Sequence, residues 1–355
     1  MLILRILEIV TSVNYEEGFS QVSLTEGLPS KNSEHIYKLC YVFVIRRRDF
    51  MLSTLRKNEL EFNNLSIANR IFEGDCISVL KHFPANSVDM VLCDLPYGIT
   101  QNNWDSIIPL EELWQEYKRV VKPNGVIALT SSGIFTAKVM LSQAQMFKYK
   151  VIWEKSKPTN FLNAKKQPLR KHEDICIFYR KQPVYNPQMT IGEPYNKGVR
   201  KNQLSGSYGD FNPVHVFSEG ERYPTDIVYF KTAESEGKVW HPTQKPIALG
   251  RYLIRTYTNP GDLVLDNAFG SGTFLVSALL EGRNFVGIEK NEDVHLFKRE
   301  AIDYIQVAKG RLEEAWTHVR DQEIANAIHK SELIEEFEEG IACQSDTTKE
   351  AGQLM

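Results

Sequence analysis

Residues 262–273 read DLVLDNAFGSGT, an apolar run that ends in an aspartate and continues into a glycine-rich turn. The apolar run predicts a buried strand over residues 262–266, and the spacing after it predicts a helix over residues 272–280. Glycines at positions 270 and 272 let the backbone approach a ligand closely, because no Cβ stands in the way. The stretch therefore predicts a strand–turn–helix unit, from which α/β sheets are built.

An acidic residue ends the next predicted strand, residues 285–289. Glu289 follows Asp266 by 23 positions, and a carboxylate at this place can accept hydrogen bonds from both hydroxyls of a ribose. The turn lacks the Lys-Ser/Thr ending of a phosphate-binding loop, so we expect a nucleoside and not a triphosphate. The alternative is that Gly270 and Gly272 serve the geometry of the turn alone.

Strands and helices alternate on both sides of this unit. The further predicted strands cover residues 71–72, 88–93, 126–129, 149–153 and 174–179, and the further helices cover residues 77–83, 110–121, 246–256 and 291–308. This alternation predicts an α/β fold with a doubly wound, largely parallel sheet.

A second group of chemical interest, DLPYG at residues 94–98, follows the predicted strand 88–93. Functional groups of open α/β sheets lie at the carboxyl ends of strands. Pro96 biases Leu95 towards an extended conformation, which turns its carbonyl outwards. Asp94, the Leu95 carbonyl and the Tyr97 ring together offer two acceptors and a stacking face, which suit an exocyclic amino group on a base. The alternative is an ordinary strand end with a packed tyrosine.

With both groups in hand, the chain resembles the DNA amino-methyltransferases, which act on adenine N6 or cytosine N4, in the β arrangement of their motifs. The matching segments, in chain order, are EGDC at 73–76, DLPY at 94–97, HEDICIFY at 172–179, HPTQKP at 241–246 and DNAFGSGT at 266–273. They span roughly residues 70–305. The catalytic tetrapeptide precedes the glycine loop, whereas methyltransferases acting on release-factor glutamine have the opposite order.

The resemblance implies a Rossmann-like domain that binds S-adenosyl-L-methionine and methylates DNA. It assigns catalysis to Asp94, Leu95, Pro96 and Tyr97. It assigns cofactor binding to Asp75, Cys76, Asp94, Thr243, Lys245, Asp266, Phe269, Gly270, Ser271, Gly272, Thr273 and Glu289. An aspartate at the first motif position favours adenine N6 over cytosine N4.

The chain departs from the family pattern at two motifs. Leu95 stands where the family has its first proline, although its carbonyl remains available. Asn267 and Ala268 replace Pro and Phe in the cofactor loop, so that Phe269 is displaced by one position.

The patterns along the chain, together with the resemblance, divide it into segments. We expect an N-terminal extension at residues 1–50, with Met51 as the working start, and a catalytic half at residues 51–180. Residues 181–238, rich in Pro, Gly, Asn and Tyr, are the expected target-recognition region. The cofactor-binding half follows at residues 239–310. An acidic tail at residues 311–355 is expected to fray over its last fifteen residues.

The formal net charge of −3 means that any affinity for DNA must come from a local basic patch. Residues 155–201 carry such an excess of positive charge. The DNA-binding residues expected there are Lys155, Lys157, Lys165, Lys166, Arg170, Lys171, Lys197, Arg200 and Lys201. The alternative for each of them is an ordinary solvated side chain.

The remaining expectations concern the setting. The five cysteines are scattered without zinc or disulfide spacing, and no apolar run reaches the roughly 18 residues of a membrane span. We therefore expect a soluble cytoplasmic enzyme without a metal, acting on double-stranded DNA. A homodimer and a companion restriction endonuclease are both compatible with the sequence. The competing functions are cytosine-N4 methylation, a catalytically silent DNA-binding protein, and methylation of a small molecule or a protein.

Overall fold

The computed structural model describes residues 54–56, 66–98, 105–200, 214–291, 295–297 and 300–351. The chain forms two compact units, one of residues 53–313 and the other of residues 1–52 with 314–355. The site lies in the first unit. The expected N-terminal extension and the expected start at Met51 lie outside the described residues.

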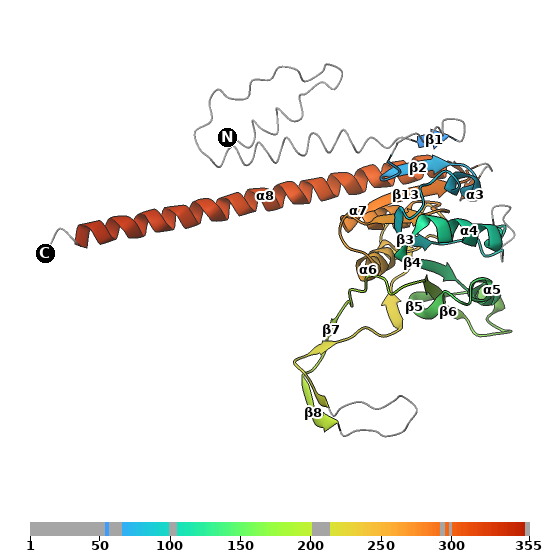
Figure 1. The fold of residues 1–355 in the computed structure, drawn as a ribbon, viewed down its shortest axis with the longest axis horizontal. Helices are drawn as coiled ribbons and strands as arrows, with labels where there is room; N and C mark the ends of the chain where they lie inside the picture. Colours follow the sequence, from blue (N-terminus) through green and yellow to red (C-terminus); the bar gives the residue numbers. More distant parts are fainter. Residues whose placement is uncertain are drawn as a thin grey trace, which may run out of the picture. The chain divides into compact units, whose positions relative to one another are not determined.

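A nine-stranded sheet forms the centre of the first unit (Figure 1). In spatial order its strands are β1 (Thr54–Arg56), β2 (Arg70–Glu73), β13 (Asn284–Glu289), β12 (Leu263–Asp266), β3 (Val88–Cys93), β4 (Val121–Ser131), β6 (Arg170–Tyr179), β5 (Phe147–Thr159) and β11 (Ile227–Phe230). Pairing is parallel from β1 to β4. It is antiparallel on both sides of β6 and parallel again between β5 and β11. The expected α/β fold with a largely parallel sheet is confirmed.

The central strands are apolar because both of their faces are covered. All four residues of β12 are buried, and five of the six residues of β3 are buried. Strands covered on both faces read as nearly continuous apolar runs and not as alternating ones. This explains why residues 88–93 and 262–266 could be recognised in the sequence.

Strands β12 and β3 are parallel neighbours, with Val264 opposite Met90 and Leu265 opposite Val91. The chain continues from β12 to β13 on one side of the pair and from β3 to β4 on the other. Ligands of open α/β sheets bind beyond the carboxyl ends of strands at such a switch point. The topology therefore brings Asp94 and Asp266, 172 positions apart in the sequence, to the same edge of the sheet.

The helices of this unit are α3 (Cys76–Leu80), α4 (Leu110–Val120), α5 (Ile134–Ser142), α6 (Ile247–Tyr257), α7 (Thr273–Leu280) and the first part of α8 (Tyr304–Ala351). Helix α4 buries Leu113, Trp114, Tyr117 and Val120, at the i, i+3, i+4 spacing of an amphipathic helix. None of the helices in the described ranges has the length and apolarity that a membrane span requires.

Where the structure describes them, residues 181–200 and 214–226 contribute no strand to the central sheet. Strands β7 (Thr190–Ile191) and β10 (Glu221–Arg222) pair with each other, as do β8 (Tyr195–Arg200) and β9 (Val214–Ser218) (Figure 1). Strand β11, by contrast, joins the edge of the central sheet although it lies within the stretch expected to be a recognition insertion. The carbonyl of Phe230 accepts a hydrogen bond of 3.0 Å from the Trp153 indole, which ties β11 to β5.

The expected helix over residues 291–308 is wrong in its first half. Strands β14 (His295–Phe297) and β15 (Glu300–Ile302) form a hairpin there, and α8 begins at Tyr304. Asp303 fixes this start because its Oδ1 accepts hydrogen bonds from the backbone N–H groups of Ile305 and Gln306. The acidic tail is helical as far as Ala351, where fraying was expected.

Candidate active site

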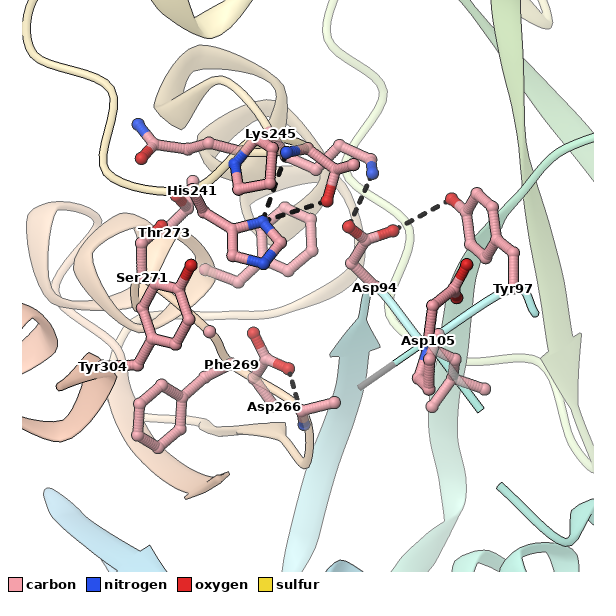
Figure 2. A pocket seen from close by; sticks show the side chains of 18 of the residues that line it. Asp94, Tyr97, Asp105, His241, Lys245, Asp266, Phe269, Ser271, Thr273 and Tyr304 are labelled. Atoms are coloured by element: carbon pink, nitrogen blue, oxygen red, sulfur yellow. Dashed lines mark hydrogen bonds and ion pairs between the residues drawn. The ribbon is translucent and has the colours of Figure 1, made fainter. Parts of the chain in front are cut away.

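A pocket of about 440 Å³ lies beyond the carboxyl ends of β3 and β12 (Figure 2). This volume falls in the range of roughly 300–1,000 Å³ that small-molecule sites occupy. Its lining combines the segment after β3 with the glycine-rich turn after β12. The two groups recognised in the sequence therefore share one site.

Most of the residues expected at the site line this pocket. They are Asp75, Cys76, Asp94, Leu95, Pro96, Tyr97, Thr243, Lys245, Asp266, Phe269, Gly270, Ser271, Thr273 and Glu289. Gly272 is the exception. It has a φ of +78°, and a Cβ added there would lie 2.8 Å from the Cβ of Ala308 in α8. Gly272 therefore serves the turn and the packing of α8.

Three donors hold the carboxylate of Asp94. The Tyr97 hydroxyl donates a hydrogen bond of 2.9 Å to Oδ1, and the Thr130 hydroxyl donates to the same atom. The ammonium of Lys245 lies 2.6 Å from Oδ2 (Figure 2). The Tyr97 ring is stacked on Phe135, with centroids 5.0 Å apart. These contacts fix the orientation of the Asp94 carboxylate at the end of β3.

A second carboxylate, Glu173 of β6, completes a buried ionic network. Its Oε1 lies 2.5 Å from the ammonium of Lys155, and its Oε2 lies 3.3 Å from that of Lys245. Oε2 also accepts a hydrogen bond of 3.3 Å from the Tyr97 hydroxyl. Two cations thus alternate with two anions in the order Lys155, Glu173, Lys245, Asp94.

The charges of this network support one another. Burial disfavours the charged form of Lys245, but the neighbouring Asp94 and Glu173 outweigh it and raise the pKa of Lys245. Burial likewise opposes ionisation of Glu173, but Lys245 and Lys155 outweigh it and lower the pKa of Glu173. Both groups are therefore charged at neutral pH.

The structure corrects the expected role of Lys155. This lysine is 6% exposed and paired with Glu173, so it does not belong to an exposed basic surface. The reason is the pleat of β5, which buries Val151, Trp153 and Lys155 on the same side. This alternation was the signal in the sequence that could have identified Lys155. Lys245 was expected to contact the cofactor, yet its ammonium binds the two carboxylates on the catalytic side of the pocket.

The glycine-rich turn is tied to the end of β13. Gly270, with a φ of +50°, donates its N–H to Glu289 Oε2 at 2.6 Å. Burial raises the pKa of Glu289, while the backbone N–H groups of Gly270 and Lys290 oppose the shift. Burial also raises the pKa of Asp266 to about 8, although the Cys93 thiol and the Ala268 N–H act against it. Two carboxyl groups beside a glycine backbone form a set that suits hydroxyl and amino donors of a nucleoside.

The first turns of α8 close over this glycine-rich turn, which sequence reasoning missed. The guanidinium of Arg311 donates hydrogen bonds to the Ser271 carbonyl at 2.5 Å and to the Thr273 hydroxyl at 3.2 Å. The Tyr304 ring lines the pocket, with its centroid 5.0 Å from that of His241 (Figure 2). Tyr304 and Arg311 lie outside every motif, so only the folded chain reveals their place at the site.

Asp105 is a further pocket residue whose role the sequence left open. Its Oδ1 accepts a hydrogen bond of 2.8 Å from the N–H of Gly98, and its side chain is buried. This bond links the two residues that flank segment 99–104. That segment, which includes Trp104, lies outside the described residues.

The other expected DNA-binding residues are exposed where the structure describes them. Lys157, Lys165, Lys166, Arg170 and Lys171 lie on the ends of β5 and β6 and the turn between them, and Lys197 lies on β8. Lys171 forms an exposed ion pair of 2.7 Å with Glu154. The side chain of Arg200 and all of Lys201 lie outside the described part of the chain.

Known proteins are similar to this chain in sequence over most of its length. The DNA methylase family matches residues 88–298, which is more than half of the chain. DNA adenine methyltransferase YhdJ of Escherichia coli (strain K12) is 29% identical over 283 residues, covering 76% of this chain and 93% of that protein. Type II methyltransferase M2.MboI of Moraxella bovis is 28% identical, covering 69% of this chain and 91% of that protein.

Among solved structures, the M1.HpyAVI–SAM complex is similar with a TM-score of 0.46 and 24% identity. The similarity covers 68% of this chain and 98% of that one. The family match spans both halves of the pocket, from β3 to the segment after β13. The chain therefore belongs to the DNA methylase family of S-adenosylmethionine-dependent amino-methyltransferases.

Proposed function

We propose that this protein transfers a methyl group from S-adenosylmethionine to N6 of adenine in double-stranded DNA. One observation carries the proposal. The Asp94–Tyr97 segment and the Asp266–Glu289 pair line the same pocket, at the switch point of the sheet. The segment that suits an amino nitrogen of the base thus lies beside the two carboxyl groups that suit the nucleoside of the cofactor.

The residues around the glycine-rich turn fit the cofactor. Glu289 ends β13 and suits the two ribose hydroxyls, since it accepts from Gly270 and faces the pocket. Asp266, with a pKa of about 8, offers a carboxyl that can donate or accept. When bound, the cofactor supplies an electrophilic methyl group on a sulfonium.

The residues after β3 would hold the target base. A carboxylate has about four lone-pair sites, and three donors occupy sites on Asp94. The remaining site can accept one N–H of the amino group, while the Leu95 carbonyl accepts the other. Both bonds favour a tetrahedral nitrogen with its lone pair directed at the methyl group. As the N–C bond forms, the methyl–sulfur bond would break with its electron pair returning to sulfur. One N–H proton must then leave the nitrogen, and Asp94 is the acceptor that we assign to it.

Two observations favour adenine over cytosine. The first position of the DLPY motif is an aspartate, Asp94, and the chain is similar to a relative named as a DNA adenine methyltransferase. Cytosine N4 is the second candidate, since it would use the same acceptors on a smaller base. In either case the base must leave the duplex, at a cost of a few kcal/mol.

In vitro methyl transfer tests the proposal. Purified protein is incubated with tritiated S-adenosylmethionine and double-stranded DNA, and the digested nucleosides are separated. Label in N6-methyladenine supports the proposal, whereas label in N4-methylcytosine refutes the choice of base. Label that enters protein or small molecules but not DNA refutes the proposed substrate.

A link to restriction is the finer part of the proposal. It is supported by similarity to M2.MboI, whose name places that protein among Type II methyltransferases. If the link holds, DNA from cells that express the protein resists one particular restriction endonuclease of matching specificity. If the DNA remains cleavable at every site that the protein methylates, the link to restriction is contradicted.

A further inference from the structure

The turn between β5 and β6, residues 160–169, presents three large apolar side chains to solvent, of which Leu169 is the least exposed at 41%. Phe161 is 74% exposed and Leu162 is 83% exposed, on the short 3₁₀ helix η2 (Phe161–Asn163). Adjacent exposed apolar side chains that are rimmed by polar residues are a feature of interaction surfaces.

The turn is ordered by its own hydrogen bonds. Asn160 has a φ of +72°, and its Oδ1 accepts a hydrogen bond of 2.7 Å from the Asn163 side chain. The Lys166 N–H donates to the Asn163 carbonyl at 2.8 Å. Phe161 and Leu162 are therefore held outwards by the conformation of the turn and not by packing.

The turn begins at the rim of the active-site pocket. Thr159 and Arg170 are partners in the register of β5 and β6, and both line the pocket. Phe161 follows Thr159 by two positions. The exposed pair thus follows the pocket lining directly in the chain, on the turn that joins the two strands carrying Lys155 and Glu173.

The charges around the turn identify its partner. Residues 157–172 contain five lysines and arginines and no aspartate or glutamate, and Lys157, Lys165, Lys166 and Arg170 are exposed. Basic side chains that flank an apolar pair are typical of proteins that insert a wedge between base steps of DNA. A second copy of this chain would bring like charges together at the same surface.

On these grounds, and resting on the proposed function, we propose that Phe161 and Leu162 form a wedge that enters the DNA stack as the target base flips into the pocket. Lys165, Lys166 and Arg170 would hold the phosphates on either side. The wedge would fill the space left in the duplex and so stabilise the extruded state.

The test compares two DNA duplexes that contain the methylated sequence, read first from genomic DNA of cells expressing the wild-type protein. In the second duplex the strand opposite the target base carries an abasic site, so no base pair must be broken. Phe161→Ala, Leu162→Ala and the double variant are compared with Leu141→Ala, which truncates a 77% exposed leucine on α5 away from the pocket.

We expect the double variant to lose about 10-fold or more in kcat/KM on the normal duplex and to recover to within about threefold of the wild type on the abasic duplex, because the base then leaves the stack without unpairing. Leu141→Ala should match the wild type on both duplexes. Melting temperatures should be unchanged, since the altered side chains are exposed.

Unchanged activity of the double variant on the normal duplex would overturn the wedge. Equal losses on both duplexes would also overturn it, and a change of molecular mass by sedimentation in the same variant would assign the pair to contact between copies. A wild-type protein that methylates neither duplex would refute the proposed function itself, a result distinct from any effect confined to the variants.

Discussion

At the scale of single residues, the site depends on carboxyl groups that lie in different surroundings. Asp94 and Glu173 are paired with lysines, whereas Asp266 is buried beside Cys93 without a cationic partner among its described contacts. The motifs predicted Asp94 and Asp266 from sequence. They could not predict the pairing of Glu173 with Lys155 and Lys245, because this pairing depends on how β5 and β6 align and on where residue 245 lies.

Replacement of Asp94 tests the catalytic assignment. We expect Asp94→Ala to lower methyl transfer by about 10²-fold or more, because an acceptor for the amino group and its proton is removed. The affinity for S-adenosylmethionine, measured by calorimetry, should change little. Weak cofactor binding with activity in proportion to occupancy would contradict the assignment.

Replacement of Glu173 tests the ionic network. Glu173→Gln leaves the two cations Lys155 and Lys245 with Asp94 as the remaining anion of the network, so we expect Lys245 to shift towards Asp94. We expect kcat to fall about 10-fold, while KM for DNA changes less. In the wild type the pKa of Glu173 is lowered. Its ionisation therefore stabilises the folded protein above the pKa of the unfolded chain, and this stabilisation is lost as the pH falls through the folded pKa. The activity of the wild type should therefore fall in acid together with the network. An unchanged pH profile in Glu173→Gln would show that Glu173 does not act through these charges.

The raised pKa of Asp266 gives a pH dependence of opposite sign. Its folded value of about 8 lies above the unfolded value of 3.8, so between these limits the folded protein holds a proton that the unfolded chain has released. Stability due to Asp266 therefore decreases as pH rises from about 4 to about 8. Asp266→Asn should remove this slope. Thermal melts of both proteins over this pH range, without cofactor, provide the measurement, and parallel curves would contradict the shift.

At the scale of elements, the central strands and the amphipathic helices α4 and α6 follow from local patterns, and the sequence predicted where they lie. It did not predict α5 or β11, and β5 extends six residues beyond the expected strand 149–153. Residues 295–302 were misjudged because an apolar spacing in so short a stretch fits a helix and a hairpin equally well. The closure of α8 over the glycine-rich turn was also beyond prediction. It rests on Arg311 and Ala308, which belong to no motif and meet the turn only in the folded chain.

Gly272 tests this closure. In Gly272→Ala an alanine would have to adopt the left-handed backbone conformation, which costs about 1–2 kcal/mol. Its Cβ would also press against Ala308. Gly282→Ala is the matched control, since its φ is +68° but no atom lies within 4 Å of the added Cβ. We expect the larger loss of stability, and the weaker cofactor binding, in Gly272→Ala. Equal losses by urea unfolding would show that α8 adds nothing at this position.

At the scale of the whole molecule, a chain with a net charge of −3 presents a basic surface beside its pocket. The composition predicted only that such a patch must be local. Which lysines belong to it required the fold, which buries Lys155 and exposes Lys165 and Lys166.

Salt dependence measures the contribution of these lysines to DNA binding. Each phosphate contact adds about 0.9 to the slope of log K against log salt, so Lys165→Ala with Lys166→Ala should reduce the slope by about 1–2. Lys138→Ala, which removes an exposed charge on α5, is the control. Identical slopes in all three proteins would place the DNA elsewhere.

The most direct test of the central claim is mass spectrometry of nucleosides from the DNA of cells that express the protein. If the protein methylates adenine through Asp94, N6-methyladenine appears with the wild-type protein and is absent with Asp94→Ala at equal expression. N4-methylcytosine in place of N6-methyladenine, or N6-methyladenine that persists in Asp94→Ala, would contradict it.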